Sequence, residues 1–177
     1  MNIWHDIDSR EITPEEFTVV IEIPKDSQCK YELDKETGFI ILDRVLFTST
    51  HYPMNYGFIP RTLSEDKDPL DVLVICSEAI VPMTLVECRP IGIIKMIDQG
   101  YEDEKIVAVC VHDPVYQDYK SLKEVPHHVL AEFKHFFEVY KTLENKETSV
   151  TEIQGMHTAK KIVQECIDRY THVFGDK

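Results

Sequence analysis

Three aspartates lie within six positions of this 177-residue chain, directly before an apolar run. They are Asp66, Asp68 and Asp71, in the segment EDKDPLDVLVI that spans Glu65 to Ile75. Carboxylates this close raise each other's pKa and repel one another unless positive charge lies among them. In an extended segment Lys67 would point away from Asp66 and Asp68, because successive side chains alternate between the two faces of a strand. The spacing therefore predicts a bound metal ion or a charged substrate.

A second pair of acids, Asp98 and Asp103, flanks a short segment between two apolar runs. A hairpin at this point would bring the two strand ends close together. Lys105 lies two residues beyond Asp103, so the two side chains would share one face of a regular strand. Several carboxylates without a His or Cys grouping favour a hard cation, above all Mg²⁺, over zinc. Mg²⁺ in turn indicates a phosphate-bearing substrate.

Side chains that could bind phosphate occur singly along the chain rather than in one motif. Lysine and arginine pair with phosphate oxygens, and tyrosine hydroxyls donate hydrogen bonds to them. The candidates are Lys30, Arg44, Lys105 and Lys141, with Tyr52, Tyr56 and Tyr140. Their spacing alone does not select them.

Short strands dominate the first two thirds of the chain. Runs rich in β-branched and apolar residues cover 17–24, 30–47, 71–76, 84–97 and 105–111, and Glu36-Thr37-Gly38 indicates a hairpin inside the second run. About five strands of this kind predict a small closed or partly closed barrel. After Pro126 the apolar residues change to helical spacing up to Leu143, and a second helix is indicated between Ile162 and Val173.

The bulk composition limits the classes of protein that fit. With 177 residues and 43% hydrophobic content, we expect one domain over residues 1–177. A net charge of -13 opposes binding to nucleic acid or anionic membranes. Five cysteines without C-x-x-C spacing indicate free thiols in a reducing compartment. The charged N-terminus and the lack of a long apolar stretch predict a soluble cytoplasmic protein.

The motif D-x-D-P-x-D-V, from Asp66 to Val72, resembles the signature of the family I soluble inorganic pyrophosphatases. Other segments resemble the same family in the same order, namely VVIEIPK, KYELDKETG, LDR, YPMNYGFIP, CRPIG, KMIDQGYEDEKIVAV and HFFEVYK. The short chain is similar to the bacterial branch, whose members are typically homohexamers. The resemblance implies an α+β, mainly β fold, with an OB-like five-stranded barrel and two C-terminal helices packed on it.

The resemblance also implies an activity, the hydrolysis of pyrophosphate to two orthophosphates with several Mg²⁺ ions per site. Asp68 would be the general base that orients or deprotonates the attacking water. The metal ligands would be Asp66, Asp71, Asp98, Asp103 and Glu22. The phosphate contacts would be Lys30, Arg44, Tyr56, Lys105, Tyr140 and Lys141, with Glu32 and Tyr52 in support.

Some features depart from the family pattern or have simpler explanations. Gln99 stands where bacterial relatives often carry an acid, and the segment TLENKETSVTEIQGM lacks their Trp-bearing strand. Tyr140 also fits the apolar stripe of the first helix, as an ordinary core residue. The adjacent His127 and His128 diverge by about 100° on a helix, so they do not form a metal pair. The alternative function is a catalytically silent OB-type metal- or nucleic-acid-binding protein, although the acidic charge opposes nucleic acid.

Overall fold

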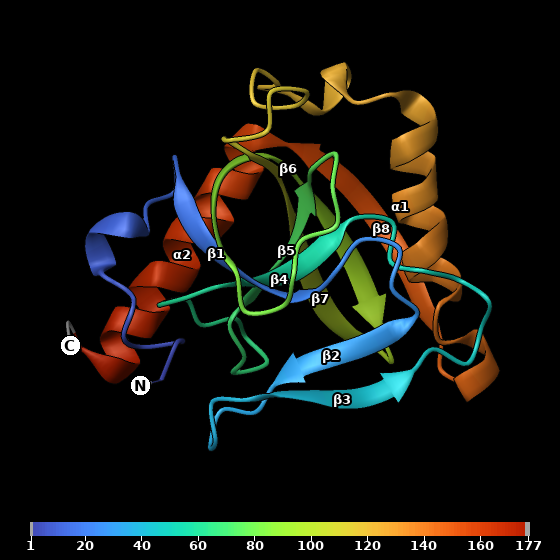
Figure 1. Ribbon diagram of the computed structural model, residues 1–177, viewed down its shortest axis with the longest axis horizontal. Helices are drawn as coiled ribbons and strands as arrows, with labels where there is room; N and C mark the ends of the chain where they lie inside the picture. Colours follow the sequence, from blue (N-terminus) through green and yellow to red (C-terminus); the bar gives the residue numbers. More distant parts are fainter. Residues whose placement is uncertain (1, 176–177) are drawn as a thin grey trace.

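A closed ring of five strands lies at the centre of the computed structural model, which describes residues 2–175 (Figure 1). In order around the ring, the strands are β1 (Phe17–Ile23), β4 (Asn55–Ile59), β5 (Leu70–Ile75), β7 (Tyr101–Cys110) and β6 (Leu85–Asp98). β6 pairs back onto β1, which closes the ring and leaves no free edge in it. β5 and β7 run parallel, whereas the other neighbours are antiparallel. The predicted OB-like five-stranded barrel is confirmed.

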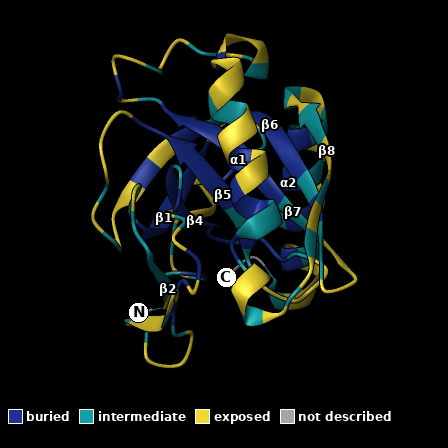
Figure 2. Cartoon of the chain, turned by 90° about the vertical axis from the view of Figure 1, so that its right-hand side faces the viewer, coloured by how far each residue is buried: buried dark blue, intermediate teal, exposed yellow. Residues whose placement is uncertain are grey.

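Two long helices pack on the barrel, α1 (His127–Val139) and α2 (Met156–Phe174). Both were predicted from helical spacing, although α1 ends before Leu143, with Tyr140 as its C-terminal cap. Burial follows the apolar stripe, and the buried residues of α1 are Phe133, Phe136 and Phe137. The outer face of α1 is exposed in Figure 2. Short 3-10 helices span Ser9–Glu11, Leu122–Glu124 and Thr142–Glu144.

The central strands are buried on both faces, which explains why their sequences read as continuous apolar runs. On β5, Val72 and Val74 belong to an apolar cluster that includes Val163 of α2. The intervening Leu73 and Ile75 belong to a second cluster, which includes the three phenylalanines of α1. Because side chains alternate along a strand, Asp71 shares the face of Leu73 and points to the side that α1 covers.

The predicted hairpin at Glu36-Thr37-Gly38 joins β2 (Cys29–Leu33) to β3 (Ile40–Val45). Gly38 has φ of +75°, and its N–H donates to the carbonyl of Asp34 at 2.8 Å. The hairpin forms a separate two-stranded sheet, however, rather than part of the barrel that its sequence suggested. It lies beside the ring in Figure 1.

Two strands were not predicted. β4 lies in the segment YPMNYGFIP, where β1 passes so close that a Cβ on Gly57 would lie 1.9 Å from the carbonyl oxygen of Val20. β8 (Thr148–Gly155) pairs with β6 outside the ring, in the segment that was expected to lack the Trp-bearing strand. The strand is present but carries no tryptophan.

Two further expectations concern the cysteines and the membrane. All five cysteines are free thiols, and four of them are buried. Within residues 2–175, none of the helices has the length and apolar character needed to cross a membrane.

Candidate active site

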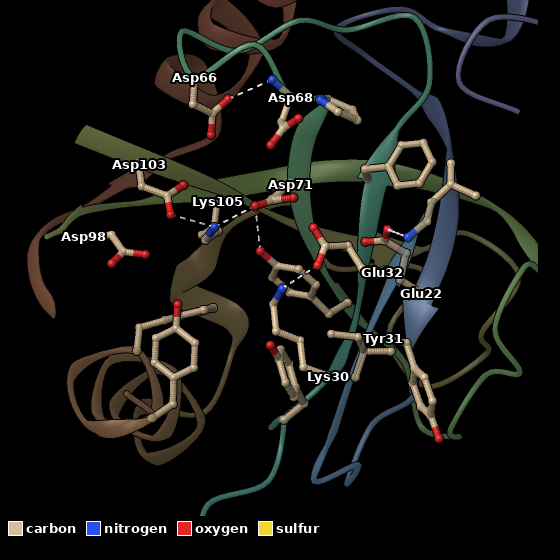
Figure 3. A pocket seen from close by; sticks show the side chains of 18 of the residues that line it. Glu22, Lys30, Tyr31, Glu32, Asp66, Asp68, Asp71, Asp98, Asp103 and Lys105 are labelled. Carbon is tan, nitrogen blue, oxygen red and sulfur yellow. Dashed lines mark hydrogen bonds and ion pairs between the residues drawn. The ribbon is translucent and has the colours of Figure 1, made fainter. Parts of the chain in front are cut away.

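The acidic and basic side chains singled out in the sequence gather around one cavity of about 240 Å³ (Figure 3). The lining residues include every candidate except Arg44, namely Glu22, Lys30, Glu32, Tyr52, Tyr56, Asp66, Asp68, Asp71, Asp98, Asp103, Lys105, Tyr140 and Lys141. They come from the barrel, the β2–β3 hairpin, the loops before β4 and β5 and the C-terminal end of α1. Segments far apart in the sequence thus supply one site.

A tight hairpin places Asp98 and Asp103 on one face of the barrel, as the sequence predicted. Its two-residue turn is Gln99-Gly100, and both residues have positive φ, at +50° and +87°, as a type I′ turn requires. Asp98 pairs with Tyr101, so the turn is shorter than the four residues between the two acids. Gln99 is exposed at the tip of the turn.

The parallel pairing of β5 and β7 sets Asp71 directly opposite Lys105. The Lys105 ammonium donates to Asp71 at 2.6 Å and lies 2.8 Å from a carboxylate oxygen of Asp103. The Tyr56 hydroxyl also donates to Asp71, at 2.7 Å. Burial alone would lower the pKa of Lys105, but Asp71 and its other neighbours raise it well above its usual value. Lys105 is therefore a permanent positive charge in the wall of the cavity.

The loop that carries Asp66 and Asp68 forms a turn. The sequence analysis treated this segment as extended, with Lys67 pointing away from the two acids. The N–H of Asp68 donates to a carboxylate oxygen of Asp66 at 3.0 Å. Lys67 lies between them with φ of +72° and is not among the residues that line the cavity. Asp68 instead pairs with Lys35, from the turn of the β2–β3 hairpin.

The opposite wall comes from β1 and β2. Glu22 is buried, and its carboxylate accepts the N–H of Leu33 at 2.8 Å. Burial raises the pKa of Glu22 to about 8. Lys30 lies within 3.1 Å of both Glu32 and Asp43, so its ammonium is held at the edge of the cavity.

The C-terminal end of α1 supplies the remaining contacts. Tyr140 is 5% exposed, belongs to the apolar cluster of α1 and also lines the cavity, so its core and site roles coexist. Burial raises its pKa above the usual range. Lys141 pairs with Asp98. Tyr52 is buried against Phe136, with ring centroids 4.7 Å apart.

Arg44 lies on β3 and does not line the cavity. Its guanidinium pairs with Glu144 at 3.0 Å and with Asp43. One terminal nitrogen is buried without a hydrogen-bond partner among the described residues. A contact between Arg44 and phosphate stays a prediction, and in this arrangement both of its acidic partners compete for the guanidinium.

The donor set of the cavity fits a hard divalent cation, because its acidic side chains offer only carboxylate oxygens. Within the described residues, no three acidic, histidine or cysteine side chains converge to hold a metal ion. Ammonium groups accompany the acids instead, with Lys105 beside Asp71 and Asp103, and Lys141 beside Asp98. The cavity thus contains negative groups that could bind a cation and positive groups that could bind an anion.

The sequence did not single out Trp4 and Lys35, which also line the cavity. Lys35 lies within the segment KYELDKETG. Nothing in this segment predicts a contact with Asp68, which lies 33 positions further along the chain. Trp4 belongs to the N-terminal segment, where no pattern predicts a place beside the barrel. Only tertiary structure brings either residue to the site.

The buried carboxyl of Glu22 makes the stability of the metal-free protein depend on pH. Its pKa is about 8 in the fold against about 4.5 for an ordinary glutamate, so folding favours the protonated form. The stabilisation is complete below about pH 4.5 and is lost as the pH rises through 8. Burial also raises the pKa of Asp103, which acts in the same direction.

We therefore expect Tm in EDTA to fall between pH 5 and 9, and to fall less steeply in Glu22→Gln. Thermal unfolding followed by circular dichroism across this range measures both slopes. Glu15→Gln, at an exposed position, is the control and should keep the wild-type slope. If Tm fell equally steeply with pH in Glu22→Gln and in the wild type, the pH dependence could not be assigned to the Glu22 carboxyl.

Comparisons with known proteins agree with one another. The inorganic pyrophosphatase family model matches residues 19–171. Soluble inorganic pyrophosphatase 1 of Arabidopsis thaliana is 50% identical over 167 residues, which is 94% of this chain and 79% of that protein. Soluble inorganic pyrophosphatase 2 of Chlamydomonas reinhardtii is 47% identical, over 94% of this chain and 87% of that protein.

Solved structures show the same relationship. The inorganic pyrophosphatase of Thermus thermophilus superposes with a TM-score of 0.92 at 38% identity, covering 97% of this chain and 99% of that chain. That of Coxiella burnetii gives 0.88 at 43% identity, over 92% of this chain and 99% of that chain. The resemblance first seen in the motif around Asp66 thus extends over nearly the whole fold, and the chain belongs to the inorganic pyrophosphatase family.

Proposed function

We propose that this chain is a Mg²⁺-dependent inorganic pyrophosphatase, which hydrolyses pyrophosphate to two orthophosphates within a single domain. The observation that carries the proposal is one small cavity lined by carboxylates, with buried or half-buried lysines among them. Pyrophosphate is compact, highly charged and without an apolar part. Its binding and its reaction must therefore come from cations and hydrogen-bond donors.

The carboxylates Asp66, Asp71, Asp98, Asp103 and Glu22 would hold the metal ions in this proposal. Bound Mg²⁺ would neutralise charge on the phosphates and lower the pKa of a coordinated water. Asp71 and Asp103 suit this role because they already lie on either side of one cationic group, the Lys105 ammonium, at 2.6 and 2.8 Å.

Asp68 is the proposed general base. It stands in the turn before β5, with a side chain that is 57% exposed, where a water can reach it. Its N–H is fixed on Asp66, so the backbone of the turn is held while the carboxylate stays accessible. Asp68 would orient the attacking water and accept its proton.

The lysines and tyrosines would bind the two phosphates. Lys105 comes from β7 of the barrel, Lys141 from just beyond α1 and Lys30 from β2, so positive charge approaches the cavity from three elements. Tyr56 and Tyr140 place hydroxyl groups in the same wall, and Glu32 and Tyr52 hold their neighbours in place. Donors fixed before the reaction stabilise the developing charge on the phosphate oxygens without reorganisation.

The size of the cavity predicts selectivity for pyrophosphate over nucleotides. Its volume of about 240 Å³ lies below the roughly 300–1,000 Å³ typical of pockets for larger ligands. We expect orthophosphate release from pyrophosphate with Mg²⁺ and at least about 100-fold slower release from ATP. A phosphate-release assay with both substrates tests this, and ATP hydrolysis at a comparable rate would contradict the proposal.

We extend the proposal to assembly and location. The resemblance to bacterial members suggests a homohexamer, and the exposed apolar side chains Phe39, Ile41, Leu42, Val45 and Phe47 on and beside β3 supply surface for contacts between subunits. Five free thiols agree with a reducing compartment such as the cytoplasm. The negative net charge and the acidic cavity disfavour nucleic acid as a partner.

A further inference from the structure

The tip of the β2–β3 hairpin reaches across the mouth of the cavity to the loop before β5. Its Lys35 ammonium pairs with a carboxylate oxygen of Asp68. The same ammonium lies 5.2 Å from the centroid of the Trp4 ring, in cation–π range. Trp4, Lys35 and Asp68 all line the cavity. This contact joins three segments that are distant in the sequence.

Trp4 is held in place by its neighbours, so its ring gives the Lys35 ammonium a fixed position to pack against. It is 6% exposed, and its indole N–H donates to the carbonyl of Thr62 at 3.0 Å. The N–H of Arg61 donates back to the carbonyl of Trp4 at 2.9 Å. The Thr62 hydroxyl accepts the N–H of Leu70 at 2.9 Å, at the start of β5. The indole is therefore anchored at Thr62, whose hydroxyl in turn binds the end of the loop that carries Asp68.

The strand ends next to the turn of the hairpin pack against the same ring. Leu33, the last residue of β2, shares an apolar cluster with Trp4 and Phe58, and Ile40 at the start of β3 packs against it. The N–H of Leu33 is also bound by Glu22. The hairpin is a separate two-stranded sheet, and such sheets are only marginally stable on their own, so its position depends on contacts of this kind.

We propose that Lys35, seated on the Trp4 ring, is a positioning residue for pyrophosphate hydrolysis. It docks the hairpin tip on the loop of Asp68 and thereby fixes Lys30 and Glu32, on β2, at the edge of the cavity. The inference rests on the proposed function, because Lys30 matters here as a phosphate contact. It adds Lys35 and Trp4 to the residues on which substrate binding depends.

The competing explanation is an ordinary surface ion pair. The side chains of Lys35 and Asp68 are 40% and 57% exposed, and exposed pairs often contribute nothing measurable. The two explanations differ in what they predict for KM. A misplaced hairpin weakens the phosphate contact of Lys30 and raises KM, whereas loss of an ordinary surface pair leaves KM unchanged.

The kinetic test uses Lys35→Ala, Lys35→Arg and the control Lys134→Ala, which removes an exposed lysine of α1 outside the cavity. We expect Lys35→Ala to raise KM for pyrophosphate about threefold to tenfold, with a smaller fall in kcat. Lys35→Arg should restore most of the lost affinity, because arginine keeps the charge and the contact with the ring. Lys134→Ala should match the wild type.

The fluorescence of Trp4 gives a second measurement that does not depend on activity, because Trp4 is the only tryptophan of the chain. If Lys35 covers the ring, acrylamide quenching should be stronger in Lys35→Ala than in the wild type and should return towards the wild-type value in Lys35→Arg. Unchanged KM in Lys35→Ala, in a wild-type enzyme that hydrolyses pyrophosphate, would overturn this inference alone. A wild-type protein without pyrophosphate hydrolysis would overturn the proposed function and this inference with it.

Discussion

Asp68→Asn is expected to lower kcat for pyrophosphate by roughly 10²–10⁴-fold, because asparagine keeps the shape of the side chain but cannot accept a proton from water. KM should rise no more than a few-fold, because the proposed phosphate contacts come from lysines and tyrosines and asparagine keeps an oxygen that can accept a hydrogen bond from Lys35. The fold should be preserved, because the side chain is more than half exposed and its N–H contact with Asp66 uses the backbone. Steady-state phosphate release at saturating Mg²⁺ measures both constants.

Asp118→Asn is the matched control, because Asp118 is exposed and does not line the cavity. It should keep the wild-type kcat and KM. A kcat for Asp68→Asn within a few-fold of the wild type would exclude Asp68 as the base and leave the water to another group. A rise in KM with unchanged kcat would instead make Asp68 a binding residue.

Lys105→Met is expected to damage both stability and activity. Lys105 is 5% exposed and its ammonium lies between Asp71 and Asp103, so its removal leaves two carboxylates facing each other without a cation. Breaking a buried ion pair costs about 3–5 kcal/mol of the free energy of unfolding. The loss of a donor to the phosphate oxygens should also lower kcat roughly 10²–10³-fold. Urea unfolding in EDTA and phosphate release measure the two effects.

Lys95→Met tests whether burial, rather than charge alone, causes the effect of Lys105→Met. Lys95 pairs with Glu104 at 3.6 Å on the adjacent strand, but its side chain is 32% exposed. Exposed pairs contribute about 0–1 kcal/mol, so this variant should stay close to the wild type in both assays. If Lys105→Met were as stable and active as Lys95→Met, the assigned role of the buried ammonium would be wrong.

Local patterns predicted those parts of the site that depend on neighbours in sequence. The alternation along a strand was enough to place Asp103 and Lys105 on one face, and a turn between apolar runs was enough to place Asp98 beside them. The helical spacing after Pro126 located α1 and with it Tyr140. In each case the residues are only a few positions apart in the sequence. The repeat of a strand or of a helix is therefore enough to place them on the same face.

Non-local contacts escaped this reasoning for physical reasons. Asp71 meets Lys105 through a parallel strand pair, 34 positions apart, and no local signal fixes that register. β4 was missed because its Asn, Gly and flanking prolines favour loops in general, whereas here Gly57 permits the close approach of β1. β8 carries polar residues on both faces, so its sequence lacks the apolar face by which a strand is usually predicted. Trp4 reaches the site only through tertiary contacts, which include Leu33, Phe58 and, on α2, Tyr170.

The most direct test of the central claim is orthophosphate release from pyrophosphate by the purified wild-type protein at neutral pH, with excess Mg²⁺ and again with EDTA. The account predicts two orthophosphates per pyrophosphate with Mg²⁺ and loss of the reaction in EDTA, restored when Mg²⁺ is added back. Equal rates with and without the metal would contradict the assignment of the carboxylates as Mg²⁺ ligands. No release with Mg²⁺ would contradict the proposed function itself.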